Sequence, residues 1–216
     1  MRTFRTPKGH DVTLDCRDGT NDAMVAESVI EHDEYGAGAM VGLEGWCVDV
    51  GAHIGAWTSM MLADFPKVSV LALEPLPVNA ERITIPEGRG IVVEGALSKS
   101  KSKVKVGWDF EGGDMESMHR YIGNQQMPKG TKGKTVSATP YSVAKLVKMC
   151  DGAIEVMKVD CEGGEQALVG ADVSPIRVIT GEYHVNRDAL VAHLGKTHTV
   201  ETSGSDTFGA FKAERK

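Results

Sequence analysis

Acidic side chains end several of the apolar runs in this chain. The run GWCVDVG ends on Asp49 and Gly51, the run VSVLALE ends on Glu74, and the run AIEVMKVD ends on Asp160, two residues before Glu162. Ligands of parallel sheets bind outside the carboxyl ends of the strands, where such carboxylates can hold a charged or hydroxyl-bearing molecule. The spacing therefore predicts a ligand site along one edge of a sheet.

A second group of candidate reactive residues ends the run IRVITGEYH, which carries Glu182 and His184. Side chains alternate along a strand, so these two residues point to the same face. If this strand lies beside the one that ends at Asp160, both residues converge with Asp160 and Glu162. With an unperturbed pKa of about 6.5, His184 is then the natural general base. The alternatives are that His184 caps a helix starting near Asn186, and that Glu162 only begins the next helix, where a carboxylate favours the helix dipole.

Lys158 lies two residues before Asp160, on the same face of its expected strand. Buried lysines need partners, and we expect Lys158 to form an ion pair with Glu182. The carboxylates of this region also suit a magnesium or calcium ion, because both ions prefer oxygen ligands. The sequence fixes no ligand set for such an ion, and we assign no metal site from it.

Strand-like and helix-like segments alternate along the chain and must position these residues. This alternation predicts an α/β fold with a doubly wound, mostly parallel sheet that helices cover on both faces. Two further strands close the chain, and we expect an antiparallel C-terminal strand. The expected strands span residues 45–51, 68–74, 90–97, 153–160, 176–184, 198–204 and 208–215, and the expected helices span residues 56–64, 77–83, 142–150, 165–171 and 186–194.

Length and composition are those of one globular domain. The 216 residues suffice for a full hydrophobic core. We expect residues 1–44 to form an entry segment that packs on the core of residues 45–216. The longest apolar runs are strand-sized, the first residues lack a signal peptide's apolar stretch, and the four cysteines show no metal-binding spacing. These features predict a reduced, cytoplasmic protein without a membrane span.

The net charge of −6 argues against a nucleic-acid-binding protein that relies on overall electrostatics. Two lysine-rich segments, SKSKSKVKV and KGTKGK, oppose this trend. They are either solvated surfaces or a rim that attracts an acidic substrate. Residues 108–140 show no clear periodicity, and form either a substrate loop or an insertion.

The stretch VDVGAHIGAWT combines an acidic strand end, a glycine turn and the start of a helix. A dinucleotide fingerprint needs G-x-G-x-x-G, so that the backbone can approach a pyrophosphate. Here three residues separate Gly51 from Gly55, and His53 stands where the second glycine of the fingerprint would be. The pattern therefore disfavours a nicotinamide-dependent oxidoreductase and suits a ligand without a diphosphate.

S-adenosylmethionine is a ligand of that kind. Its amino-acid end carries an ammonium and a carboxylate. Asp49 supplies charge, either directly or by holding the turn through backbone N–H groups, and free N–H groups at the helix start face the carboxylate. Glu74 lies 19 residues after Gly55, where a carboxylate accepts hydrogen bonds from both ribose hydroxyls. The alternative is a tight turn without a ligand and two incidental acids.

These motifs together resemble the FkbM family of S-adenosylmethionine-dependent methyltransferases. The resemblance covers residues 17–184 and rests on VDVGAHIGAWT, LEPLPVNAERI, EGALSKS and MKVDCEGGEQALVGA, in that order, and on the upstream stretch RDGTNDAMVAESVIEHDEYG. Family members commonly have a small polar residue where this chain has His53. The resemblance implies the class I methyltransferase fold. It also implies a cofactor site formed by Asp22, Tyr35, Asp49, Gly51, Ala52, His53, Gly55, Thr58, Glu74, Pro75, Asn79, Ala96 and Asp160.

The resemblance further implies O-methylation of a hydroxyl on a sugar, a glycan or a small natural product. Methyl transfer from a sulfonium is an in-line displacement, so the enzyme mainly aligns the acceptor and excludes water. A hydroxyl acceptor also benefits from a base. The chain has DCEG where base N-methyltransferases have a D/N-P-P-Y/F turn. The alternatives are a 2′-O-methyltransferase of RNA and a scaffold protein that binds the cofactor without catalysis.

Overall fold

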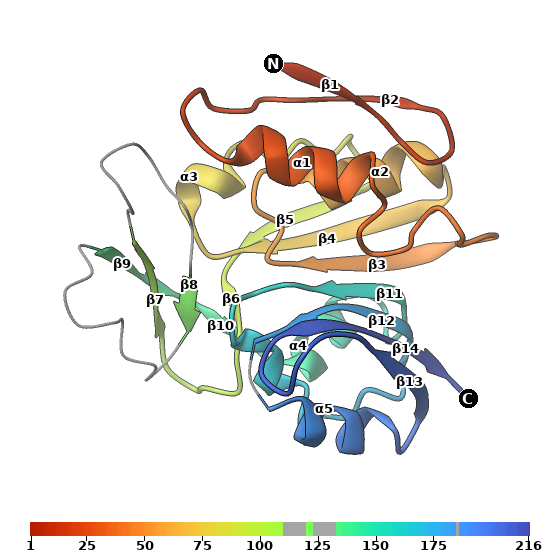
Figure 1. Ribbon diagram of the computed structural model, residues 1–216, viewed down its shortest axis with the longest axis vertical. Helices are drawn as coiled ribbons and strands as arrows, with labels where there is room; N and C mark the ends of the chain where they lie inside the picture. The colour runs from red at the N-terminus through yellow and green to blue at the C-terminus, as the bar shows by residue number, and fades with distance from the viewer. Residues whose placement is uncertain (110–119, 123–132, 185) are drawn as a thin grey trace.

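A seven-stranded sheet forms the centre of the protein in the computed structural model, which describes residues 1–109, 120–122, 133–184 and 186–216 (Figure 1). Its strands are β3 (Gly45–Val50), β4 (Val68–Glu74), β5 (Gly90–Glu94), β11 (Ile154–Val159), β12 (Ile176–Tyr183), β13 (His198–Thr202) and β14 (Gly209–Arg215). Their order in the sheet is β13-β14-β12-β11-β3-β4-β5. Neighbouring strands are parallel except at β14, which is antiparallel to both of its neighbours.

Helices cover both faces of this sheet (Figure 1). They are α1 (Asp22–Ile30), α2 (Ala56–Asp64), α3 (Pro77–Ala80), α4 (Val143–Met149) and α5 (Arg187–Leu194).

Alternation along the strands divides the apolar residues between two cores. Cys47 of β3 belongs to the same apolar cluster as Trp57 of α2, whereas its neighbour Val48 belongs to the cluster that includes Leu146 of α4. Strands β3, β4, β11 and β12 thus each pack one set of side chains under α1 and α2 and the other set under α4 and α5. The prediction of a class I methyltransferase fold, with a doubly wound, mostly parallel sheet and an antiparallel C-terminal strand, is confirmed.

The strand order places a topological switch point between β3 and β11. From β3 the chain builds outward through β4 to β5, and from β11 it builds outward in the opposite direction to β12. Ligands of doubly wound sheets bind in the crevice outside the carboxyl ends of the strands at such a point. Asp49 of β3 and Lys158 of β11 are register partners there.

The first residues form a hairpin and a helix that the sequence does not predict. Strands β1 (Arg2–Arg5) and β2 (Asp11–Leu14) pair antiparallel, and α1 follows them. Phe4, Val12 and Ala26 from this segment join the apolar cluster that contains Trp57 of α2. Because the two strands have only four residues each, their alternation is too short to read from the sequence alone.

Two expected elements differ from the structure. The strand expected over residues 90–97 breaks at Gly95, which lies so close to Tyr141 that a Cβ there would be 2.5 Å from its ring. After the break, β6 (Ala96–Leu97) pairs with β10 (Pro140–Tyr141). The helix expected over residues 165–171 is one turn of 3₁₀-helix, Gly164–Ala167, which follows Gly163 with a left-handed φ of 99°.

The region expected to lack periodicity, residues 108–140, contributes to a small antiparallel sheet in its described part. This sheet consists of β7 (Val104–Asp109), β8 (Arg120–Ile122) and β9 (Gly133–Ala138). The lysines of SKSKSKVKV are exposed, whereas Lys129 and Lys132 of KGTKGK lie outside the described residues. None of the helices in the described parts of the chain is long and apolar enough to cross a membrane.

Candidate active site

The glycine turn after β3 lies against the end of β11 at the switch point and leads into α2. Gly51 has a φ of 74°, and a Cβ there would lie 1.8 Å from the carbonyl oxygen of Asp160, so only glycine fits. Gly55 has a φ of 86°, and a Cβ there would lie 3.0 Å from Ile83. His53, between them, has a φ of 53°, which few residues other than glycine adopt. The two glycines thus allow β3, β11 and the start of α2 to meet.

Asp49 is wholly buried behind this turn. Its Oδ2 accepts hydrogen bonds from the backbone N–H (3.1 Å) and the hydroxyl (2.7 Å) of Thr58 at the start of α2. Its Oδ1 lies 3.2 Å from Nζ of Lys158, which also donates to the carbonyl of Gly51 at 2.8 Å. Asp49 therefore holds the turn, one of the two roles that the sequence allows. The ion pair of Lys158 is with Asp49, where the sequence predicts Glu182, because Asp49 is its register partner.

Glu74 is also wholly buried, at the end of β4. Its Oε2 accepts a hydrogen bond from the backbone N–H of His53 at 2.9 Å. Its Oε1 accepts hydrogen bonds from the backbone N–H of Leu76 (3.1 Å) and from Nδ2 of Asn79 (3.2 Å). These bonds fix the carboxylate between the glycine turn and the segment after β4, where the sequence predicts the ribose contact.

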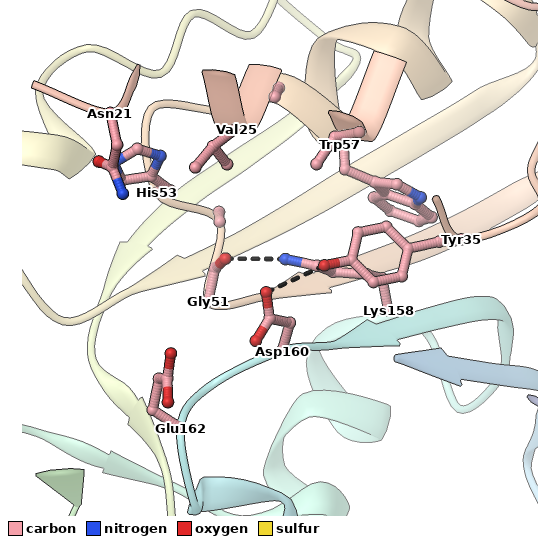
Figure 2. A pocket seen from close by; sticks show the side chains of 12 residues that line it. Asn21, Val25, Tyr35, Gly51, His53, Trp57, Lys158, Asp160 and Glu162 are labelled. Carbon is pink, nitrogen blue, oxygen red and sulfur yellow. Dashed lines mark hydrogen bonds between the residues drawn. The ribbon is translucent and has the colours of Figure 1, made fainter. Parts of the chain in front are cut away.

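A cavity of about 150 Å³ opens at the switch point (Figure 2). Asn21, Val25 and Val29 bring α1 and the residue before it to its wall, beside Trp57 and Lys158. Six of the predicted site residues also line it, namely Tyr35, Gly51, Ala52, His53, Asp160 and Glu162.

A second, narrower cavity lies on the side of β4 and β6 and shares Gly51 with the first. Pro75 and Ala96, both predicted site residues, line it together with Leu97 and Cys161. The other predicted cofactor residues are buried and line neither of these two cavities; they are Asp22, Asp49, Gly55, Thr58, Glu74 and Asn79.

The four predicted catalytic residues come together at the ends of β11 and β12, which are adjacent strands. Nε2 of His184 lies 3.2 Å from a carboxylate oxygen of Glu162 and 3.5 Å from one of Glu182. Asp160 lies on the same side, and Oδ2 of this residue accepts a hydrogen bond from the hydroxyl of Tyr35 at 2.9 Å. Tyr35 and Asp160 both point into the first cavity in Figure 2.

Glu165 supports this cluster, a role that the sequence does not predict. Its side chain is wholly buried at the position where the sequence predicts the first residue of a helix. Its two oxygens accept hydrogen bonds from the backbone N–H groups of His184 and Gly163, each at 2.8 Å. The apolar run ALVGA, which begins two residues after Glu165, is the only sequence signal for such burial.

The family model for the FkbM methyltransferase domain matches residues 49–200, which is more than half of the chain. The chain belongs to this family. No curated protein sequence matches it.

Several solved structures resemble this FkbM methyltransferase domain at low sequence identity. TrmK of M. capricolum, in complex with S-adenosylhomocysteine, is 8% identical with a TM-score of 0.46, over 82% of this chain and 64% of that chain. Precorrin-6y C5,15-methyltransferase from Geobacter metallireducens is 13% identical with a TM-score of 0.45, over 81% and 82% of the two chains. CalO1, a methyltransferase of calicheamicin biosynthesis, is 12% identical with a TM-score of 0.44, over 91% and 55%. The FkbM chain thus spans less than two thirds of TrmK and of CalO1.

Burial and neighbouring charges set the pKa values of the FkbM cluster. Burial and the Asp160 carboxylate raise the pKa of Glu182 to about 7. Burial lowers the pKa of His184, but the hydrogen-bonded Glu165 and the charge of Glu162 outweigh it and raise this pKa to about 9. At neutral pH His184 therefore carries a proton. It must lose this proton before it can act as the general base that the sequence predicts.

A buried ionic network connects the entry segment to the glycine turn. Nε and one terminal nitrogen of Arg17 each donate to a different oxygen of Asp22 at 2.8 Å. Nε2 of His53 lies 3.2 Å from Asp22, whose side chain is wholly buried. Asp22 therefore contacts His53, which lines the first cavity, and does not line that cavity itself. The sequence does not predict a role for Arg17, because no pattern in it shows that Arg17 pairs with Asp22 of α1.

The variant Asp22→Asn is expected to be less stable than the wild type near neutral pH by about 1.5–3 kcal/mol, the contribution of hydrogen bonds to a charged group. Burial opposes ionisation, but the bonds from Arg17 and His53 hold the pKa of Asp22 well below its usual range. A depressed pKa stabilises the fold above the unfolded value of about 3.9, and this stabilisation is lost as the pH falls toward the folded value.

Urea unfolding near pH 7 and near pH 3 measures the effect of Asp22→Asn. The difference from the wild type is expected to shrink at the lower pH, and a difference that stays constant contradicts the assignment. Asp18→Asn, a change at an exposed residue of the same segment, is the matched control.

Proposed function

We propose that this FkbM methyltransferase transfers the methyl group of S-adenosylmethionine to a hydroxyl of a sugar, a glycan or a small natural product. The observation that carries this proposal is the convergence of Asp160, Glu162, Glu182 and His184 beside the cavity at the switch point. A hydroxyl must lose its proton when it is methylated, and these groups stand where a proton can be taken.

The cofactor is proposed to lie across Gly51, with its amino-acid end in the first cavity and its nucleoside toward the second. Two observations support this orientation. The fixed carboxylate of Glu74 stands at the end of β4 on the side of the second cavity, near the lining residue Pro75. The start of α2 borders the first cavity through Ala56 and Trp57, and a helix N-terminus favours a carboxylate.

The transfer itself needs alignment more than covalent chemistry. The acceptor oxygen forms a bond to the methyl carbon as the carbon–sulfur bond breaks, and the electron pair of that bond stays on the neutral sulfur of S-adenosylhomocysteine. The acceptor proton passes to the cluster at the ends of β11 and β12. Holding both reactants in this geometry lowers the barrier because it removes the entropy cost of bringing them together.

Residues 1–44 are proposed to act as an entry segment that covers the cofactor. Asn21, Val25, Val29 and Tyr35 of this segment line the first cavity, and the pair between Asp22 and His53 ties it to the glycine turn. We further expect the protein to act in the cytoplasm as a single domain of residues 45–216 with this segment packed on it.

Transfer of a labelled methyl group tests the proposed function. The purified chain is incubated with methyl-labelled S-adenosylmethionine and a panel of free sugars, oligosaccharides and hydroxylated natural products, with Asp160→Asn as the inactive control. Nuclear magnetic resonance of a labelled product is expected to show a methyl ether. A methyl group on nitrogen or carbon overturns O-methylation, and S-adenosylhomocysteine binding without transfer to any acceptor supports a scaffold protein instead.

The variant Glu74→Gln is expected to bind S-adenosylhomocysteine more weakly by about 1–3 kcal/mol, the cost of removing hydrogen bonds to a charged group. The amide of Gln has one acceptor oxygen in place of two, so it cannot accept from both the His53 N–H and the Leu76 N–H. The turn beneath the proposed cofactor site is therefore held less firmly. Calorimetric titration measures the change. Glu94→Gln, at the exposed register partner on β5, is the control. Equal affinity in folded Glu74→Gln and wild type contradicts the ribose assignment.

A further inference from the structure

Three potential metal ligands of different chemistry meet beside the first cavity. One carboxylate oxygen of Asp160, one of Glu162 and one ring nitrogen of His184 all lie within 4.8 Å of one another. We propose that Asp160, Glu162 and His184 bind a divalent cation. The binding itself is independent of the proposed function, and only the role of the ion in methyl transfer rests on it.

The distances among these atoms suit a single ion. Oxygen and nitrogen ligands lie about 2.0–2.3 Å from Mg²⁺ or a similar ion, so ligands on opposite sides of it stand about 4–4.6 Å apart. The cluster spans 4.8 Å at most and requires only a small contraction. Nε2 of His184, at 3.2 Å from Glu162, already has the separation of two neighbouring ligands.

Asp160 and His184 are each held by a partner outside the set. The hydroxyl of Tyr35 donates to Asp160 at 2.9 Å. The wholly buried Glu165 accepts the backbone N–H of His184 and lies 3.8 Å from its Nδ1. The Glu165 carboxylate therefore lies on the Nδ1 side of the ring, beyond hydrogen-bond distance, and Nε2 is the nitrogen nearest Glu162. Glu162 stands in the turn after β11, in a left-handed conformation with a φ of 51°.

The cluster also borders the first cavity, where the amino-acid end of the cofactor is proposed to lie. Asp160 and Glu162 both line the first cavity, and Figure 2 shows their carboxylates on the same side of Gly51. The ammonium of Lys158, two residues before Asp160, is directed to Asp49 and to the Gly51 carbonyl. Two carboxylates and an imidazole therefore meet at the cavity edge, whereas an acidic patch on the surface would offer oxygen alone.

Two carboxylate oxygens and one imidazole nitrogen favour Mg²⁺ or Mn²⁺ among the common cations, with Mn²⁺ better suited to the nitrogen. Three protein ligands leave open positions for water and for the acceptor hydroxyl. A bound cation lowers the pKa of such a hydroxyl and orients it toward the methyl group. In this state His184 is a ligand, which loses its proton on binding, and Glu182 is the carboxylate beside the ion.

Titration of the full chain with Mn²⁺ alone tests the proposal, with and without S-adenosylhomocysteine. Electron paramagnetic resonance follows free Mn²⁺, and calorimetry gives the stoichiometry. One ion per chain is expected. The variants Glu162→Gln and His184→Asn are each expected to bind at least about 10-fold more weakly, because removing even an outer partner of a metal site costs that much. Glu87→Gln, on an exposed loop, is the matched control and is expected to bind normally.

The outcomes separate the ion from the proposed function. Saturable binding that both variants lose supports the site, whether or not any acceptor is methylated. Absence of binding in both conditions, or binding that Glu162→Gln and His184→Asn retain, overturns it. If O-methylation proceeds in the presence of a chelator while Mn²⁺ binding is absent, the ion is excluded and the methyltransferase assignment stands. Circular dichroism of each variant shows whether a lost site reflects a lost fold.

Discussion

Replacing His184 with asparagine is expected to slow methyl transfer about 100-fold or more while leaving the affinity for S-adenosylhomocysteine unchanged. The imidazole stands between Glu162 and Glu182 at the ends of β11 and β12, and its proposed role is to assist removal of the acceptor proton. Losing a group that assists proton transfer typically costs 10²–10⁴-fold in rate. His184 lines neither of the two cavities assigned to the cofactor, so the variant keeps that site.

Single-turnover kinetics with the acceptor found by the labelling experiment, together with calorimetric titration of S-adenosylhomocysteine, measure the two halves of this prediction. His193→Asn on α5 is the matched control, because that imidazole bonds to the carbonyl of Ala171 away from the cluster. A His184→Asn rate equal to wild type removes the residue from the chemistry. A rate loss with an equal loss of cofactor affinity makes His184 a structural residue instead.

The strands and their ends are the part of this fold that sequence pattern predicts well. Runs such as VSVLAL are apolar at all positions but one because both faces of a parallel strand are covered, and a run of this length is typical of a buried strand. The ends of β11 and β12 follow directly, so the convergence of Asp160 and Glu182 with His184 is predictable once the two strands are adjacent. The position of the site can therefore be predicted from the local sequence pattern and from one assumption, that β11 and β12 are adjacent strands.

The supporting contacts are less predictable because they join residues far apart in the sequence. Tyr35 bonds to Asp160 across 125 positions, and Lys158 bonds to Gly51 across 107. Resemblance to the family places Tyr35 at the cofactor site, but its contact with Asp160 depends on how the entry segment docks. Glu165 shows the same limit: its burial depends on the 3₁₀ turn that replaces the expected helix.

Breaking the pair between Asp49 and Lys158 is expected to be the most destabilising change to the fold. The side chains are 0% and 5% exposed, and the ammonium also bonds to Gly51 in the cofactor turn. Removing one partner of a buried pair typically costs about 3–5 kcal/mol, because the remaining charge is left without compensation. Asp49→Asn keeps an oxygen for Thr58 while removing the charge, and Lys158→Met removes the ammonium at similar length.

A double-mutant cycle in urea isolates the interaction between these two residues. The double variant Asp49→Asn with Lys158→Met removes both charges of this pair, and is expected to be less destabilised than the sum of the single variants by about 1–3 kcal/mol. If the two losses simply add, within about 0.5 kcal/mol, the pair is not coupled. Because Lys158 holds the Gly51 carbonyl, the double variant is also expected to bind S-adenosylhomocysteine more weakly than wild type. A loss of cofactor affinity in the double variant would show that the pair positions the glycine turn in addition to stabilising the fold.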